Sequence, residues 1–175
     1  MNYQDVIDKY YPAGSKLRDI YLKHSRSVAD LAMSINRERT LGLDEKEVEA
    51  AAMLHDIGIF LTDASGIECR GTEPYLKHGY LGAELLRKEG VDEKYARVCE
   101  RHTGTGLSRE DIVASGIDLP LDRSYMPETL LERLVCYADK FYSKNGDMEK
   151  KSIERIEKSL AKFGSRAVER FRKLI

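Results

Sequence analysis

Apolar side chains recur every three or four residues along most of this chain, a pattern typical of helices with one buried face. The clearest case lies between about residues 16 and 40, after a helix-breaking turn at 12–14 and a good N-cap at Ser15. Its apolar face comprises Leu17, Ile20, Tyr21, Val28, Leu31, Ala32 and Ile35. We therefore predict a long helix here, preceded by a short helix at about 3–11.

Capping residues divide the rest of the chain into further helices. Asp44 and Glu47 are typical of a helix start, and that helix should end near Asp56 with Gly58 as its terminator. Pro127 suits the first turn of a later helix. The remaining start and stop signals predict helices at about 74–89, 92–104, 108–115 and 127–144. Two more helices are predicted after a turn at 145–147. The segments between them, above all 58–72, are predicted loops.

No segment shows sustained alternation of polar and apolar residues between hairpin turns. We therefore predict an all-α fold, a bundle of about 7–9 helices. A chain of 175 residues is long enough for one domain with a substantial core, so we expect a single domain over 1–175.

Composition and charge exclude several classes of protein. The 29 basic and 30 acidic side chains leave a net charge of -1, which gives no indication of a nucleic-acid surface. No apolar run approaches the roughly 20 residues of a membrane helix, and the N-terminus does not resemble a secretory signal. Cys69, Cys99 and Cys136 are far apart and odd in number, so a disulfide framework is not expected. We expect a cytoplasmic protein with no membrane partner.

The last 25 residues form an amphipathic pattern. Its apolar positions are Ile153, Ile156, Leu160, Phe163, Val168, Phe171 and Leu174. We expect two helices that pack on the domain's own core. A homodimer seam along them is the alternative.

Polar side chains interrupt the apolar faces of several predicted helices. His24 lies in register with Ile20 and Val28, and Asp139 follows Leu131 and Val135 at helical spacing. His55, His78 and His102 are in similar register, and Asp56 follows His55 directly. All four histidines of the chain thus fall on predicted buried faces.

Inward-pointing imidazoles and carboxylates are the donor set that divalent transition metals select. An unpaired carboxylate in a core is costly, so Asp56 and Asp139 need a partner or an ion. Taken singly, each histidine could be a hydrogen-bonded core residue, and each aspartate a charge at a helix face or end. Taken together, they predict a divalent metal site, and manganese, iron, zinc, cobalt and nickel all suit these donors.

The order of these residues resembles the HD-domain superfamily of metal-dependent phosphohydrolases. The resemblance rests on His24, the pair His55-Asp56 within AAMLHDIG, and Asp139 within CYADKF, and it covers about 15–145. It implies an HD-type helical bundle with that core and with C-terminal helices at about 147–175 packed on it. It also implies that these four residues hold a divalent metal.

His78 and His102 occur where a subset of the superfamily adds two histidines. The resemblance implies that they bind a second metal and that Asp56 bridges the two ions. The segment RHTGTG is similar to symmetrical diadenosine-tetraphosphatases and to cyclic-dinucleotide phosphodiesterases with HD-GYP signatures. Leu107-Ser108 stand where the second group has tyrosine and proline, so that likeness is partial.

The cation that many relatives carry directly after HDIG is missing, because Ile59 occupies its place. Other residues could contact a substrate phosphate or could lie on a solvated face. We predict Arg70, Lys77, Thr103 and Lys140 as substrate-binding residues, with Arg101 and Thr105 as further candidates.

The functional hypothesis is a phosphohydrolase that acts on a nucleotide or another small phosphoester through a metal-activated water. His55 and Asp56 are the predicted catalytic residues, and Asp56 would accept a hydrogen bond from that water. Two alternatives remain: an HD module that binds a nucleotide without cleaving it, and a di-iron oxygenase.

Overall fold

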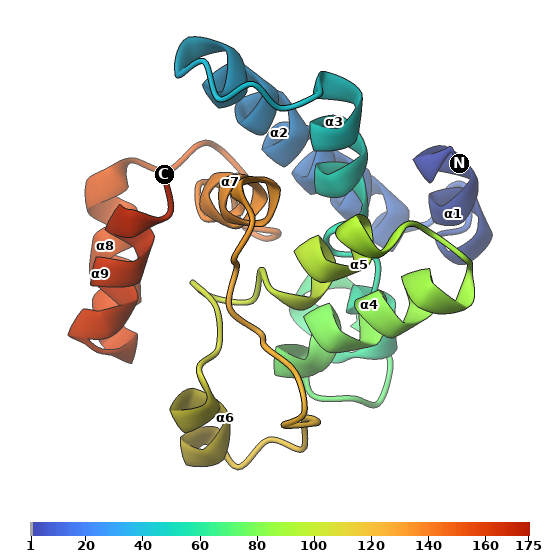
Figure 1. Ribbon diagram of the computed structural model, residues 1–175. Coiled ribbons are helices and arrows are strands. Elements are labelled where there is room, and N and C mark those ends of the chain that lie inside the picture. Colours follow the sequence, from blue (N-terminus) through green and yellow to red (C-terminus); the bar gives the residue numbers. More distant parts are fainter. Residues whose placement is uncertain (1) are drawn as a thin grey trace.

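The computed structural model describes residues 2–175, which form nine α-helices joined by turns and longer loops (Figure 1). The helices are α1 (Tyr3–Tyr10), α2 (Lys16–Glu38), α3 (Glu45–Leu54), α4 (His78–Lys88), α5 (Glu93–Glu100), α6 (Arg109–Ser115), α7 (Leu130–Asp139), α8 (Ile153–Leu160) and α9 (Ser165–Lys173). The predicted all-α class is confirmed. No helix among these residues is long and apolar enough to cross a bilayer.

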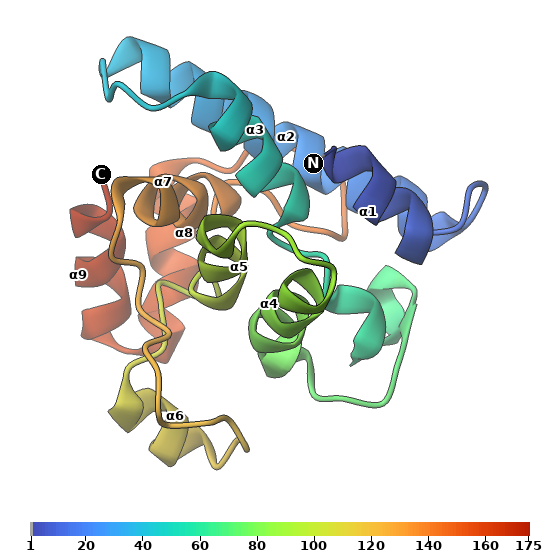
Figure 2. The same ribbon diagram turned by 45° about the vertical axis from the view of Figure 1, so that its right-hand side comes forward.

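Helix α2 is the long element against which the others are arranged. Ser15 caps it, accepting a hydrogen bond from the backbone N–H of Arg18 at 3.1 Å. The helix packs along α3 and α7, and α4 packs on α5 (Figures 1 and 2). Ala51 and Ala52 are fully buried, and their small side chains let α3 lie close to α2. This arrangement points the predicted apolar face of α2 into the core.

The C-terminal helices α8 and α9 contribute buried side chains to the main core. Ile156, Leu160, Phe171 and Leu174 are buried in the main core. The ring of Phe171 stacks on Tyr137 of α7 with a centroid separation of 5.0 Å. Phe163, by contrast, is 82% exposed, because it lies in the turn between α8 and α9.

Helix α6 lies in a segment that projects away from the rest of the bundle (Figure 2). Ile112, Leu119 and Tyr125 form a small apolar cluster of their own under it. The predicted loop at 58–72 contains 3-10 turns and a pair of two-residue antiparallel strands, β1 (Asp63–Ala64) and β2 (Cys69–Arg70).

Three predicted helix boundaries are wrong. Helix α7 begins at Leu130 rather than at Pro127, because Thr129 is the N-cap and accepts a hydrogen bond from the backbone N–H of Glu132 at 3.2 Å. It ends at Asp139 rather than near 144, and the chain turns there. Helix α5 ends at Glu100, so His102 lies just beyond it.

Gly58 is required because there is no room for a side chain at this position, and its backbone conformation does not demand glycine. Its φ of -86° is available to any residue. Gly58 therefore does not end α3 by adopting the left-handed conformation that a terminating glycine provides. A Cβ at this position would lie 2.4 Å from the carbonyl oxygen of His78 and 2.5 Å from the backbone nitrogen of Gly82. The missing side chain therefore lets the turn after α3 contact the first turns of α4.

We expect Gly58→Ala to lower the free energy of unfolding by about 2–3 kcal/mol, because the added methyl group meets backbone that must move. Chemical denaturation followed by circular dichroism measures the loss. Gly66→Ala is the matched control, since a Cβ there meets nothing within 4 Å. Equal stabilities for the two variants would contradict the close-packing explanation.

Candidate metal centre

One group of ligand atoms is formed by His24, His55, Asp56 and Asp139, which the fold brings together from three helices. His24 lies in the middle of α2, the His55-Asp56 pair directly follows α3, and Asp139 is the last residue of α7. Asp139 Oδ1 lies 2.9 Å from Nε2 of His24 and 3.2 Å from Nε2 of His55. Asp56 Oδ2 lies 3.3 Å from each of these two nitrogens.

A second group of ligand atoms uses the other oxygen of Asp56. Asp56 Oδ1 lies 3.1 Å from Nε2 of His102 and 3.4 Å from Nε2 of His78. His78 is the first residue of α4, and His102 directly follows the end of α5. The carboxylate of Asp56, which is fully buried, thus faces one group with each oxygen.

Two buried tyrosines hold the turn that carries Asp56. The Tyr21 hydroxyl donates to the carbonyl oxygen of Met53 at 2.6 Å, and the Tyr11 hydroxyl donates to that of Ile57 at 2.8 Å. The last carbonyls of a helix have no partner within the helix, so these hydroxyls satisfy groups that burial would otherwise leave unpaired. They fix the backbone on both sides of the His55-Asp56 pair.

Three imidazoles share one orientation. Nδ1 of His55, His78 and His102 lies 2.5–2.6 Å from the carbonyl oxygen three residues earlier. A carbonyl oxygen only accepts, so Nδ1 carries the proton and Nε2 is turned towards Asp56. Such a backbone contact is the usual support of a metal-binding histidine.

The charges in the site favour a cation between the carboxylates. Burial favours the neutral form of His55, yet Asp56 and Asp139 raise its pKa to about 10. Burial also opposes ionisation of Asp56, but the charges of His55 and Lys144 hold its pKa well below the usual range. Burial lowers the pKa of His102 to about 4, so this imidazole is neutral at pH 7 and offers a lone pair.

These residues fit a divalent metal. The Nε2 atoms of His78 and His102 lie 3.0 Å apart, although neither imidazole has a proton there in its Nδ1–H tautomer. Two lone pairs this close repel each other unless a cation binds both. Nitrogen ligands with bonds of about 2.1 Å to one ion lie about 3 Å apart when they are neighbours. The donor set is the one that transition metals select.

Two lysines complete the charge balance at the site. Lys140 Nζ donates to Asp139 Oδ2 at 2.7 Å and to the carbonyl oxygen of His102 at 3.0 Å. Lys144 Nζ donates to Asp56 Oδ2 at 2.8 Å. Lys144 is not among the site residues that the sequence predicts. Helix α7 ends at Asp139 rather than near 144, and the turn that follows brings Lys144 to Asp56.

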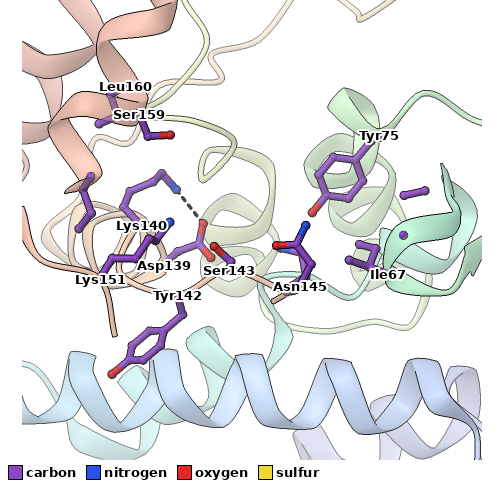
Figure 3. Close-up of a pocket in the computed structure, with 14 residues that line it drawn as sticks. Ile67, Tyr75, Asp139, Lys140, Tyr142, Ser143, Asn145, Lys151, Ser159 and Leu160 are labelled. Carbon is purple, nitrogen blue, oxygen red and sulfur yellow. Dashed lines mark hydrogen bonds and ion pairs between the residues drawn. The ribbon is translucent and has the colours of Figure 1, made fainter. Parts of the chain in front are cut away.

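A cavity of about 430 Å³ opens beside the first group of ligand atoms (Figure 3). Asp139 lines it, together with Lys140, Lys144 and Lys151. Figure 3 shows Tyr75 across the cavity from Asp139, Lys140 and Lys151. Three lysines and one aspartate line the cavity, and this excess of positive charge suits an anion.

The other residues predicted to bind substrate lie elsewhere. Arg70 is on the exposed edge of β2, where it pairs with Glu68 at 3.3 Å. Lys77 pairs with Glu73 at 3.3 Å and does not line the cavity. Thr103 is also outside the lining. Of the four predicted residues, the structure brings only Lys140 to the cavity beside the metal ligands.

Arg101 has a structural contact instead of a substrate-facing position. Its guanidinium lies 2.8 Å from the carboxylate of Glu132, which is 2% exposed. Burial opposes ionisation of Glu132, but hydrogen bonds from the Glu128 backbone N–H, Arg101 and Thr129 outweigh this and lower its pKa. The ion pair ties the end of α5, and so His102, to the start of α7.

The HD domain family model matches residues 21–143, which include all six candidate ligands. The chain belongs to the HD domain family. An uncharacterized protein of Methanocaldococcus jannaschii is 36% identical over 135 residues, which cover 76% of this chain and 70% of the relative.

Another relative is a much longer protein. A protein of Thermoplasma volcanium named tRNA (cytidine(56)-2'-O)-methyltransferase is 34% identical over 171 residues, or 98% of this HD domain chain. The chain spans only 45% of that relative's length.

The fold also matches a solved HD domain. The L. monocytogenes phosphodiesterase PgpH HD domain aligns with a TM-score of 0.57 at 17% identity, covering 98% of this chain and 94% of that one. A structure of the same domain in complex with cyclic-di-AMP aligns with a TM-score of 0.56. At this identity the likeness establishes the fold.

We expect Glu132→Gln to lower the free energy of unfolding by about 1.5–3 kcal/mol at pH 7, the value of a hydrogen bond to a charged group. The folded state lowers the pKa of Glu132 below 4.5, so its ionised form contributes stability above that pH, and the contribution is lost as the pH falls further. Urea denaturation of chelator-treated protein at several pH values should show the gap between parent and variant closing below about pH 4.5.

Glu128→Gln is the control for this prediction. Its side chain is 61% exposed and contacts the same arginine, Arg101, at 3.3 Å, so the change should cost under about 0.5 kcal/mol. A loss as large as that of Glu132→Gln, or a gap that persists at low pH, would contradict the assignment.

Proposed function

We propose that this HD domain protein is a divalent-metal-dependent phosphohydrolase whose substrate is a nucleotide or another small phosphoester. One observation carries the proposal: a lysine-lined cavity opens beside a buried set of six histidine and aspartate ligands. The metal ligands are suited to hydrolysis by a metal-activated water, and the lysines are suited to binding an anionic substrate.

We infer two metal ions. His24, His55, Asp56 and Asp139 would hold one, and Asp56, His78 and His102 the other. Manganese, iron, zinc, cobalt and nickel all suit this donor set. Divalent ions in such a site lower the pKa of water and offset the charge of phosphate oxygens.

The chain's own residues would orient the substrate and its attacking water. The Asp56 carboxylate faces both groups of ligands, so it is placed to accept a hydrogen bond from a water molecule between them. His55 and the two tyrosine hydroxyls keep that carboxylate in place. In the cavity, the ammonium groups of Lys140, Lys144 and Lys151 would supply positive charge that attracts a phosphate group.

The size of the cavity and the relatives support a nucleotide. A volume of about 430 Å³ is within the ordinary range for small-ligand sites. The phosphodiesterase PgpH HD domain, which shares the fold, has been solved with cyclic-di-AMP.

A second candidate function is a nucleotide-binding module without turnover. The observation that favours it is the Thermoplasma volcanium relative, in which a sequence similar to this chain is less than half of a protein named for tRNA methylation. A module within such a protein could serve binding alone. The two candidates differ in whether a bound phosphoester is cleaved.

We expect between one and two metal equivalents per chain, close to two, in protein purified without chelator or nickel affinity resin. His78→Ala should lower the value to about one, because it removes a ligand of one group only. Asp56→Ala should lower it towards zero, because both groups lose a ligand. Plasma mass spectrometry measures the content. A parent protein that stays near zero after incubation with each metal would overturn the proposed function.

Turnover is expected on a panel of nucleotides, cyclic dinucleotides and phosphomonoesters in the presence of Mn²⁺. Asp56→Asn should lower kcat at least about 10²-fold, the range for loss of a positioned acid-base group. Lys77→Met is the control, since Lys77 lies outside the cavity, and it should stay within about twofold. Phosphate release measures the rate. Tight nucleotide binding without cleavage would favour the second candidate, and oxygen consumption by an iron-loaded protein would point to an oxygenase.

A further inference from the structure

Lys144 lies where the metal ligands and the cavity meet. Its side chain is 12% exposed, and its Nζ donates to Asp56 Oδ2 at 2.8 Å. The same ammonium lies 5.7 Å from the ring centroid of Tyr75, on the opposite cavity wall. One charged group thus contacts the buried carboxylate and also lines the space where an anion would bind.

The hydrogen-bonding capacity of Lys144 is only partly used. An ammonium group has three protons to donate. Within the part of the chain that the structure describes, Lys144 makes one hydrogen bond, whereas Lys140 makes two, to Asp139 and to the His102 carbonyl. Lys144 therefore still has protons to donate to a ligand.

The turn after the His55-Asp56 pair provides no cation of its own. Ile57 and Ile59 are both fully buried in the core. A positive charge beside Asp56 has to come from another element, and the turn after α7 provides it.

We propose that Lys144 is the side chain that binds the phosphate group of the substrate next to Asp56. The inference rests on the proposed phosphohydrolase function. Lys144 Nζ donates to a non-bridging phosphate oxygen, and Lys140 remains attached to Asp139 and the His102 carbonyl. Lys144 is a group that touches substrate, and its loss should therefore affect phosphate binding directly.

This role predicts two effects of opposite sign. Removing the ammonium weakens phosphate binding, because a charged donor is lost. It does not weaken metal binding and should strengthen it, because a positive charge 2.8 Å from Asp56 Oδ2 repels a cation bound to that oxygen. A purely structural role for Lys144 would weaken both, since the ligands would lose their arrangement.

The test uses the full chain and the variants Lys144→Met, Lys144→Arg and Lys150→Met. Methionine keeps a long side chain without charge, and arginine keeps the charge. Lys150→Met is the control in the same turn, because Lys150 is exposed and does not line the cavity. Isothermal titration calorimetry measures the Kd for Mn²⁺ alone, then the Kd for inorganic phosphate on the Mn²⁺-loaded protein.

We expect Lys144→Met to raise the phosphate Kd about tenfold or more, with an equal or lower Kd for Mn²⁺. Lys144→Arg should recover most of the phosphate affinity, and Lys150→Met should match the parent in both titrations. Where turnover is measurable, KM should rise more than kcat falls. An unchanged phosphate Kd in Lys144→Met, or a joint loss of metal and phosphate binding, would overturn the proposal.

The outcome for Lys144 can be separated from the outcome for the proposed function. A parent that binds no metal refutes the metallohydrolase, and phosphate titration without metal then tests Lys144 by the same variants. A parent that binds neither metal nor phosphate refutes both. A metal-loaded parent whose phosphate affinity does not depend on Lys144 refutes only the assignment of this residue.

Discussion

The buried carboxylate of Asp56 is the constraint on which the arrangement of this protein depends. Its two oxygens face different histidines, and no part of the side chain reaches solvent. A carboxylate in that position is stable only if positive charge and hydrogen-bond donors surround it. The long helix α2, the close contact at Gly58 and the early end of α7 each bring one such group to it: His24, His78 and Lys144, respectively.

The site is built mainly at helix ends. Five of the six candidate ligands lie at a helix end or in the turn that follows it, and only His24 lies within a helix. Helix ends leave carbonyl groups without intrahelical partners, and here three imidazoles donate to carbonyls of the preceding turn. The same geometry therefore satisfies the backbone and turns each Nε2 inward. A site composed only of mid-helix residues would lack this coupling between backbone and ligand orientation.

This construction explains how much could be predicted from the sequence. Helical periodicity predicted which faces are buried, and it identified α2, α3 and the C-terminal pair because their apolar positions repeat over several turns. The six candidate ligands followed from their types and order. Lys144 did not, because its position depends on where α7 stops, and that is decided by the turn after Asp139 rather than by a repeating pattern. Tyr11 and Tyr21 were missed for a related reason: an apolar face shows that a tyrosine is buried, but it does not show which carbonyl the hydroxyl meets.

The charge balance argues for an anionic ligand more strongly than any single residue does. Asp56 and Asp139 are matched by Lys144 and Lys140, each in direct contact with one of them, so this part of the site is close to neutral when the histidines are neutral. Divalent ions bound to the histidines would then leave the site strongly positive. The two carboxylates already have partners, and Lys151 adds a further positive charge to the cavity. An incoming anion can offset this excess in a partly buried space, where water screens charge weakly. A phosphate group has the charge and the acceptor oxygens to do so.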